Sequence, residues 1–359
     1  MKLYTYDDMA SRLDIVRQFQ DLTDQGTLVE LVSQIRPHLR NVIGVTIGKG
    51  GVGKTTVATN LAYVLAEEQA QRAKEGRSAL PVLYIELDAN GNSRNDFGLR
   101  GTEFDDDARA FIEAVVADKS LTVVKDARPY LDVVPSGAAN GELATQIGKL
   151  NSEHGLAAFL LLALLIAQIS HHYRWIVIDF SPSDKNNQRL GISAVTHMIA
   201  PIKGSDDGVL EGLAALARLV RGIRVINPEA WIAAIAFLGF KKVKGEPTSE
   251  LINLREKIVE MVVDANMSED VVMSSYVREA PVLAALCRNT GMPAKELALA
   301  ASGRLTSPVD GDIVPRPRDE NGRYVDSDKA ADLADDYTNL AAEVIRQVRQ
   351  RNKELQVQA

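Results

Sequence analysis

Cysteine is almost absent from this chain, because its 359 residues include only Cys287. A single cysteine excludes an internal disulfide framework, and it excludes a metal cluster held by cysteine pairs within one chain. Both exclusions suit a reducing compartment. The plainest interpretation of Cys287 is a small buried apolar side chain.

Export signals, long apolar runs and an excess of basic residues are also lacking. The N-terminal stretch MKLYTYDDMASRLD is acidic and has no apolar signal core. The most apolar run, residues 156–167, falls short of the roughly 20 residues that span a bilayer, so we expect a buried helix. With a formal net charge of -7, contact with nucleic acid requires a local basic patch. We therefore expect a cytoplasmic protein with no stable membrane anchor.

What the sequence does contain is a regular alternation of strand-like and helical segments. Short apolar runs alternate with longer helical patterns, of which residues 54–72 and 208–223 have the length of crossover helices. This rhythm predicts an α/β fold, a doubly wound and mostly parallel sheet with helices on both faces. The expected strands are residues 42–47, 82–87, 131–134, 175–179, 198–202 and 231–238.

The expected organisation has four parts. Residues 1–40 have helical spacing and many charges, which predicts a helical N-terminal extension. Residues 41–300 hold the α/β domain. Residues 301–327 are polar and rich in Gly, Pro, Asp and Arg, which predicts a surface loop or insertion. Residues 328–359 are expected to form a C-terminal helix that packs on the domain.

A phosphate-binding loop is the most specific motif. Gly48, Gly53, Lys54 and Thr55 fit the phosphate-loop pattern, which here follows an expected strand and opens an expected helix. Its glycines let backbone N–H groups surround phosphate oxygens at the positive end of the helix dipole. We expect Lys54 to neutralise the β- and γ-phosphates and Thr55 to coordinate Mg²⁺. The predicted nucleotide-binding residues are Gly48, Lys49, Gly50, Gly51, Val52, Gly53, Lys54, Thr55 and Thr56.

The run KGGVGKTT, residues 49–56, resembles the deviant Walker A loop of the ParA/MinD superfamily of ATPases. In that family the additional lysine, here Lys49, reaches across a dimer interface to the partner's nucleotide and acts like an arginine finger. The resemblance implies a P-loop NTPase fold, an ATP-dependent homodimer and catalytic roles for Lys49 and Lys54. A lysine that serves only solubility is the alternative for Lys49. Weaker matches extend the resemblance over roughly residues 42–300 and the last helix: residues 131–136, 195–213, 278–281 and 291–293.

A first acidic segment follows the second expected strand, at the edge where an open α/β sheet places its ligands. Residues 86–92, ELDANGN, resemble the family's switch segment DxDPQGN. The resemblance implies that Asp88 orients or activates the attacking water, which makes it a catalytic residue. A turn cap is the alternative role for Asp88. Glu86 stands in place of the first Asp of the motif, and Ala89-Asn90 stand in place of Pro-Gln.

A second acidic segment, WIVIDFSPS at residues 175–183, resembles the Walker B strand. The resemblance implies that Asp179 holds Mg²⁺ together with Thr55, usually through a coordinated water. Phe180-Ser181 replace the family's Thr-Pro, which alters the second switch. The expected strand at residues 231–238 is not followed by the usual polar residue, so no adenine contact is assigned. ATP as the nucleotide is implied by the family alone.

Within the superfamily the sequence favours the ParA-type partition ATPases. Branches with metal clusters need paired cysteines, and bacterial tyrosine kinases need a tyrosine-rich tail, whereas this chain ends in QVRQRNKELQVQA. MinD-like proteins finish with an amphipathic membrane helix, and here only Leu355 and Val357 are apolar beyond Val348. A MinD-like ATPase that positions a membrane or a protein scaffold remains the alternative.

ParA-type dimers bind DNA without sequence preference through Lys and Arg. Two short basic groups are candidates here, with a solvated charged face as the alternative. The extension of residues 1–40 is too short for the helix-turn-helix domain of larger plasmid ParA proteins, so operator binding is not expected. The candidate DNA-binding residues are Arg218, Arg221, Arg224, Lys241, Lys242 and Lys244.

The resemblance thus implies a slow, Mg²⁺-dependent ATP hydrolase that is associated with the nucleoid. The protein is expected to dimerise on ATP, bind DNA non-specifically and drive segregation of plasmid or chromosomal DNA with a ParB-like centromere-binding adaptor that stimulates hydrolysis. Because Ala89-Asn90 and Phe180-Ser181 depart from the family pattern, an ATP-locked dimer that scarcely hydrolyses is a further hypothesis.

Overall fold

A nine-stranded sheet lies at the centre of the computed structural model, which describes residues 1–6, 9–18, 25–181, 184–204, 207–243, 246–307 and 311–358. Its order is β1-β4-β5-β3-β6-β2-β7-β8-β11. The seven strands from β5 to β11 run parallel, and β4 is antiparallel to both neighbours, so the predicted doubly wound, mostly parallel sheet is confirmed. In sheet order the strands are Lys2–Tyr6, Leu121–Arg128, Leu131–Val133, Val82–Glu86, Trp175–Asp179, Val42–Val45, His197–Lys203, Trp231–Phe240 and Val272–Arg278.

The three central strands β2, β3 and β6 are buried at every position. Their apolar side chains face both ways, as expected for a parallel sheet covered on two sides. Two acids interrupt this pattern, because Glu86 ends β3 and Asp179 ends β6. The two residues are register partners in the ladder. Burial of paired carboxylates is unfavourable unless the site supplies hydrogen-bond donors or cations. This edge of the sheet is therefore the first place to look for a binding site.

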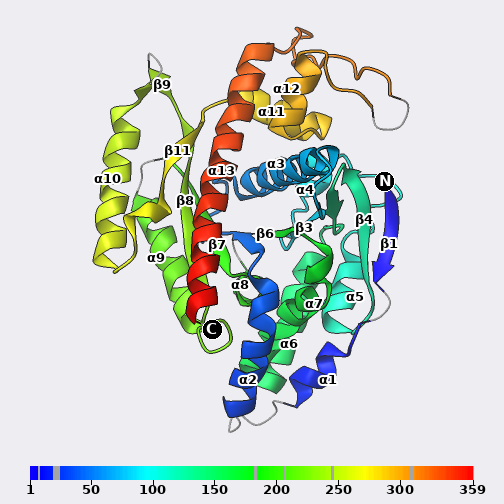
Figure 1. Cartoon of the computed structure of the whole chain (residues 1–359), viewed down its shortest axis with the longest axis vertical. Helices are drawn as coiled ribbons and strands as arrows, with labels where there is room; N and C mark the ends of the chain where they lie inside the picture. The colour runs from blue at the N-terminus through cyan, green and yellow to red at the C-terminus, as the bar shows by residue number, and fades with distance from the viewer. Residues whose placement is uncertain are drawn as a thin grey trace.

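One face of the sheet is covered by the helix α3 and by four elements from later in the chain (Figure 1). The α3 helix starts directly after the glycine-rich loop, and α13, red in Figure 1, lies across it. The side chains of α3, α11, α12 and α13 pack into one apolar core with the strands. The elements of this layer are α3 (Lys54–Lys74), α4 (Ser93–Asp96), α11 (Pro281–Thr290), α12 (Ala294–Ala301) and α13 (Ser327–Gln358).

The opposite face carries the larger apolar core. It includes the crossover helices α8, between β6 and β7, and α9, between β7 and β8. Because α3 and α8 leave the sheet on opposite faces, a crevice forms at the carboxyl ends of β2, β3 and β6. The elements of this layer are α1 (Arg12–Arg17), α2 (Gln25–Ile35), η1 (Arg36–Leu39), α5 (Arg109–Val116), α6 (Asn140–His154), η2 (Gly155–Leu160), α7 (Leu161–Ile169), η3 (Ser170–His172), α8 (Lys185–Ala194), α9 (Asp207–Gly222), α10 (Ser249–Asp264) and η4 (Glu269–Val271).

The N-terminal segment differs in part from the expected helical extension. Lys2–Tyr6 forms the edge strand β1, which pairs antiparallel with β4, so the helical expectation is wrong there. Its partner lies more than a hundred residues away, and pairing with it is invisible in the local helical spacing. The following helices are part of the body, since the guanidinium of Arg12 is buried and donates to Ala114 O and Lys119 O.

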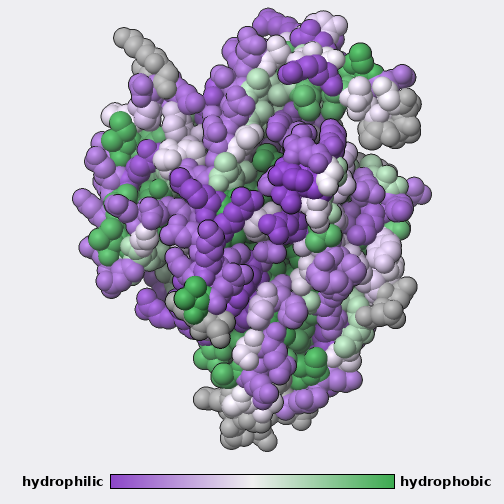
Figure 2. Space-filling view, viewed as in Figure 1, coloured by the Kyte–Doolittle hydropathy of each residue, from purple (hydrophilic) through white to green (hydrophobic). Residues whose placement is uncertain are grey.

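The apolar run at residues 156–167 is helical and buried, as expected, in η2 and α7. Among the described residues, Asn140–His172 is the helical segment long and apolar enough to cross a membrane by length and composition, and 67% of its apolar window is buried inside the protein. The visible surface is mostly hydrophilic, with apolar residues scattered in small groups (Figure 2). This helical segment is therefore a core element of the fold.

The last described residues form the long helix α13, whose carboxylates accept hydrogen bonds from backbone N–H groups of β11. Glu343 accepts hydrogen bonds from the N–H groups of Ser274 and Ser275, at 2.8 and 2.9 Å. Near the end of α13, Leu355 is 6% exposed, whereas Val357 is 88% exposed. Of the two apolar residues beyond Val348 that the sequence offered for membrane contact, one is therefore buried in the body.

Candidate nucleotide-binding site

The glycine-rich loop lies between β2 and α3, at the carboxyl edge of the sheet. Gly51 and Gly53 have positive φ angles of 72° and 90°, a conformation that side chains other than glycine adopt only with strain. A Cβ atom at Gly50 or Gly51 would meet nothing within 4 Å, so the space over the loop is open. Gly53 is the N-cap of α3, which places the positive end of this 21-residue helix at the same space. This geometry is that of an anion-binding cradle.

Lys54 is the cation of this cradle. Its side chain is 6% exposed, and its Nζ donates to Lys49 O across the loop at 3.0 Å. Burial lowers the pKa of Lys54, while the charges of Asp179 and Asp88 oppose that shift. The ammonium therefore lies between the loop and the two carboxylates that the sequence predicted for the site.

Asp179 and Thr55 fit a magnesium site. Asp179 is fully buried, and burial followed by the nearby charge of Glu86 raises its pKa well above the ordinary value, although Thr55 and Lys54 lower it. Its Oδ1 has no hydrogen-bond partner of good geometry among the described residues, and its Oδ2 has only a long contact of 3.5 Å from the Tyr84 hydroxyl. A buried carboxylate oxygen without a partner, beside a threonine hydroxyl, is suited to water-mediated binding of a hard cation.

Asp88 lies at the start of the turn that leaves β3 and is 7% exposed. Its Oδ1 accepts a hydrogen bond from Asn90 N at 3.1 Å, and its carbonyl accepts one from Gly91 N at 3.2 Å. The turn-capping role that the sequence left open is therefore present. The charge of Asp88 also raises the pKa of Lys54, so this carboxylate lies near the ammonium of the cradle. A role of Asp88 toward the attacking water stays a prediction.

Glu86 is a buried acid of the site, at a position to which the sequence assigned no role. Its carboxylate is 1% exposed and accepts hydrogen bonds from the backbone and side chain of Ser93, from Asn92 N and from the Ser136 hydroxyl. Burial raises its pKa to about 7 against the opposing effect of these donors. A carboxylate inside an apolar strand was the available signal, because its burial requires donors from elsewhere in the chain.

Two buried asparagines donate hydrogen bonds to the backbone carbonyls of residues 86–88, the segment that carries Glu86 and Asp88. Asn140 of α6 donates to Glu86 O at 2.9 Å and to Asp88 O at 3.4 Å. Asn187 of α8 donates to Leu87 O at 3.4 Å and to Asn140 O at 3.1 Å. The end of β3 is thus connected by side-chain hydrogen bonds to α8, the helix that follows β6.

Lys49 lies on the partly exposed rim of the loop, close to α9. Gly212 of α9 makes this approach possible, because a Cβ there would lie 3.2 Å from Ile47 Cγ1 and 4.0 Å from Lys49 Cβ. The glycine of the Glu211-Gly212-Leu213 run therefore has a steric role. The geometry of one chain does not test a cross-subunit role, and that role of Lys49 stays a prediction.

Phe180 explains one of the departures from the family pattern. It is fully buried, and its ring fills the space between two glycines, because a Cβ at Gly44 would lie 2.9 Å from Phe180 Cε1 and one at Gly191 would lie 2.7 Å from Cζ. The side chain is therefore part of the core. Ser181, the next substituted position, is 5% exposed, and its carbonyl accepts a hydrogen bond from Gln188 Nε2 at 3.1 Å.

The two groups of candidate DNA-binding residues lie at opposite edges of the sheet. Arg218, Arg221 and Arg224, at and after the end of α9, are exposed and precede the first residue of β8. Lys241 and Lys242 follow the last residue of β8, roughly 30 Å away along a ten-residue strand. The structure does not bring the two groups together.

These groups also differ in their charge environment. Lys241 pairs with Glu279 at 3.7 Å and Lys242 with Asp336 at 3.4 Å. Within the described ranges of the chain, Arg218 and Arg221 have no ion pair. Lys244, the remaining candidate, lies outside the described residues. The α9 arginines are thus the cations available to an external anion.

The late runs at residues 278–281 and 291–293 have structural roles. Arg278 forms an ion pair with Asp336 of α13 at 2.7 Å. Gly291 has a φ of 65°, and a Cβ there would lie 2.8 Å from Gly98 N. Both runs hold the α11–α13 layer against the body.

Comparison with known proteins identifies the family of this chain. Residues 40–230 match the protein family described as an AAA domain. The chromosome partitioning protein ParA of Caulobacter vibrioides is 26% identical over 244 residues, which cover 67% of this chain and 83% of that protein. The chromosome partitioning protein ParA of Myxococcus xanthus is 25% identical over 203 residues, which cover 55% of this chain and 65% of that protein.

Solved structures show the same fold at low identity. McdA of Cyanothece superimposes with a TM-score of 0.57 at 16% identity and covers 72% of this chain and 93% of its own. A putative plasmid partition protein of Borrelia burgdorferi, bound to AMPPNP, gives a TM-score of 0.53 at 17% identity and covers 86% of this chain and 98% of its own. The family match spans more than half of the 359 residues. The chain belongs to this AAA-domain family and, within it, to the ParA-like members of the ParA/MinD superfamily of P-loop ATPases.

Proposed function

We propose that this protein is a ParA-type partition ATPase, which binds ATP with Mg²⁺, dimerises, binds DNA without sequence preference and releases it on hydrolysis. The observation that carries the proposal is the meeting of Lys54, Asp88 and Asp179 at one cradle, with Lys49 on its rim. A partly exposed lysine at the rim can reach a nucleotide bound by a second subunit.

Each residue of the site has a proposed role in hydrolysis. Backbone N–H groups of residues 48–53 and the ammonium of Lys54 bind the phosphates. Thr55 and Asp179 would hold Mg²⁺, which would neutralise charge on the β- and γ-phosphates. Asp88, whose carboxylate is already oriented by its own turn, accepts a hydrogen bond from the attacking water and aligns it. Lys49 of the second subunit places positive charge where the transferred phosphoryl group becomes more negative.

The DNA contact is assigned to the exposed arginines of α9, since Lys241 and Lys242 are already paired with carboxylates. Non-specific binding of this kind needs only phosphate contacts and weakens steeply with salt. The names of the curated relatives, chromosome partitioning protein ParA, support DNA as the cargo. A ParB-like adaptor that stimulates hydrolysis would complete the cycle, in the cytoplasm and on the nucleoid.

The test is co-sedimentation of the full chain with non-specific duplex DNA in the presence of ATP, ADP or no nucleotide. Binding is expected with ATP alone, and it should be lost in an Arg218→Glu, Arg221→Glu variant. A Lys241→Ala, Lys242→Ala variant is the matched control and should keep most of the binding. Binding that ignores the nucleotide, or no binding at all, would rule out the DNA switch. Liposome flotation with ATP examines the MinD-like alternative directly.

A further inference from the structure

The carboxylate of Glu86 is the most fully coordinated acid in the described part of the site. Asn92 N donates to Oε1 at 3.0 Å, and Ser93 N and Ser136 Oγ donate to Oε2 at 3.1 and 2.6 Å. The Ser93 hydroxyl donates to the same Oε2. Among the described residues no cation forms an ion pair with Glu86. Its partners are therefore neutral groups from two separate loops, and the interaction ties those loops together.

The segment that Glu86 holds is the turn that begins at Asp88. Asp88 caps this turn through Asn90 N, and the turn returns to Glu86 at Asn92 and Ser93. The far end of the turn is thus bonded back to Glu86, the last residue of β3. An aspartate at position 86, as the family pattern has it, would be shorter by one carbon–carbon bond of about 1.5 Å. The longer glutamate reaches Ser93 and Ser136 together.

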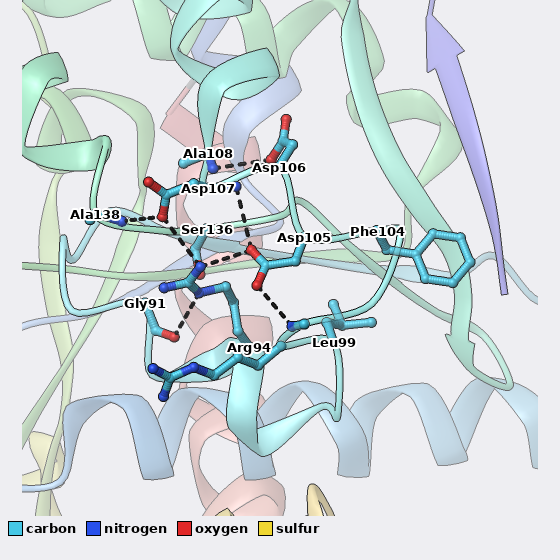
Figure 3. Close-up of polar contacts among 12 residues, drawn as sticks. Gly91, Arg94, Leu99, Phe104, Asp105, Asp106, Asp107, Ala108, Ser136 and Ala138 are labelled. Carbon is cyan, nitrogen blue, oxygen red and sulfur yellow. Dashed lines mark hydrogen bonds and ion pairs between the residues drawn. The ribbon is translucent and has the colours of Figure 1, made fainter.

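A second set of contacts is made by Arg94, the residue after Ser93 (Figure 3). Its guanidinium contacts Asp105 Oδ1 at 2.8 Å and Asp107 Oδ1 at 3.2 Å. Asp107 Oδ1 also accepts from Ala138 N at 2.8 Å, and Ala138 lies two residues after Ser136. The turn after Asp88 is therefore connected to the loop that follows β5 in two ways. Glu86 binds Ser136 directly, and Arg94 pairs with Asp107, whose carboxylate accepts the hydrogen bond from Ala138 N.

Close packing leaves this arrangement little freedom. A Cβ at Gly137 would lie 2.2 Å from Asp107 Oδ1 and 2.5 Å from its Cα, so only glycine fits between the two loops. Asp107 itself has a φ of 59°, a left-handed conformation that needs support from its surroundings. The loop after β5 thus forms a rigid base for the turn that carries Asp88.

We propose that Glu86 is a positioning residue for Asp88: by binding Asn92, Ser93 and Ser136 it holds the turn on which Asp88 is oriented toward the γ-phosphate. This inference rests on the proposed ATPase function. It also gives a reason for glutamate in place of the usual aspartate. In this role Glu86 acts through the orientation of Asp88.

The experiment compares the full chain with Glu86→Gln, Ser136→Ala, Asp88→Ala and the double variant Glu86→Gln, Asp88→Ala. Glutamine keeps the size of Glu86 but presents an N–H₂ group to the N–H of Ser93, whereas Ser136→Ala removes one donor and leaves β3 intact. Glu296→Gln is the matched control, because Glu296 is also buried and bonded, to Arg128 at 2.7 Å, but lies on α12. ATP hydrolysis is measured with amide exchange of the peptide that covers residues 88–95.

Glu86→Gln is expected to lower kcat by about 10- to 100-fold with KM for ATP changed by less than about twofold, the signature of a misplaced catalytic group. Ser136→Ala should have a smaller effect in the same direction. In the Asp88→Ala background, Glu86→Gln should cause no further loss, because two residues that act as one unit are not additive. Amide exchange at Asn92 and Ser93 should become faster in Glu86→Gln and stay unchanged in Glu296→Gln.

Three results would overturn the proposal: an equal fall in kcat for Glu86→Gln and Glu296→Gln, an undiminished effect in the Asp88→Ala background, or unchanged amide exchange in both Glu86→Gln and Ser136→Ala. If Glu86→Gln does not fold, Ser136→Ala decides by the same criteria. If the wild-type chain does not hydrolyse ATP, the proposed function fails. Amide exchange then still decides whether Glu86 holds the turn.

Discussion

Asp96, at the end of α4, offers a direct test of how burial of a carboxylate near the turn that begins at Asp88 affects the stability of the protein. It ends α4, is 6% exposed, and accepts one hydrogen bond, from Thr59 Oγ1 at 3.3 Å, while its Oδ1 has no partner among the described residues. Burial raises its pKa from 3.8 to about 6, against the lowering effect of Thr59 and the charge of Arg288. The other titratable groups that it influences are Tyr84 of β3, Cys287 of α11 and Tyr337 of α13.

The direction of the effect on stability follows from the raised pKa. The unfolded chain loses the Asp96 proton near pH 4, whereas the folded protein keeps it to about pH 6, so folding becomes less favourable as pH rises through this window. A shift of about two pKa units corresponds to roughly 3 kcal/mol. Asp96→Asn, which has no charge to bury, is therefore expected to raise the free energy of unfolding by up to about 3 kcal/mol at pH 8 and by less than about 1 kcal/mol at pH 4.

Urea denaturation of the wild-type protein and Asp96→Asn at several pH values between 4 and 8 measures this difference. Asp105→Asn is a control of opposite sign: burial raises the pKa of Asp105, but hydrogen bonds from Arg94 and Gly101 outweigh it and lower the pKa overall. Asp105→Asn should be less stable than the wild type at pH 8, with the difference shrinking in acid. A constant Asp96→Asn effect across the pH range, or a destabilised variant at pH 8, would refute the reasoning.

The remaining predictions concern the cradle and its core. Lys54→Ala should weaken ATP binding itself, whereas Lys49→Ala should preserve binding by the monomer and abolish dimer-dependent hydrolysis; titration with a fluorescent ATP analogue and a phosphate-release assay separate the two, and equal losses of binding would contradict the cross-subunit assignment. Asp88→Ala should trap ATP-bound dimers in size-exclusion chromatography, and an unchanged hydrolysis rate would show that Asp88 is only a turn cap. Gly191→Ala should cost about 1–3 kcal/mol of stability in urea denaturation, because its methyl group would overlap the Phe180 ring. Phe180→Leu in the same background should recover part of that loss, and no recovery would contradict the packing argument.

Much of the candidate site could be predicted because its signals are local. Glycines around Lys54, an apolar run before Asp179 and an acid at the end of a strand each follow from a few neighbouring residues. The alternation of apolar runs and helical patterns likewise predicted the parallel sheet and its two helical layers, which the structure confirms. Such features depend on backbone geometry that a short segment determines by itself.

Other features were missed because their causes lie far apart in the sequence. The strand β1 forms by pairing with β4, and N–H groups of β11 donate hydrogen bonds to Glu343 of α13. Phe180 was interpreted as a change in the second switch, yet its ring is accommodated in the core by Gly44 and Gly191. In each case a residue has a role that only a distant partner defines.

The sequence by itself predicted the candidate site of this protein: a glycine-rich loop with one lysine inside and another on its rim, and the acids Asp88 and Asp179 near the ends of two strands. Only the tertiary structure decided how that site is held. Glu86 accepts hydrogen bonds from Ser93 and Ser136, and Arg94 forms ion pairs with Asp105 and Asp107. These contacts connect loops that are distant in the sequence. The physical reason is that binding groups for a phosphate are supplied by adjacent backbone, whereas the orientation of a catalytic side chain depends on contacts between loops that meet only when the sheet is complete.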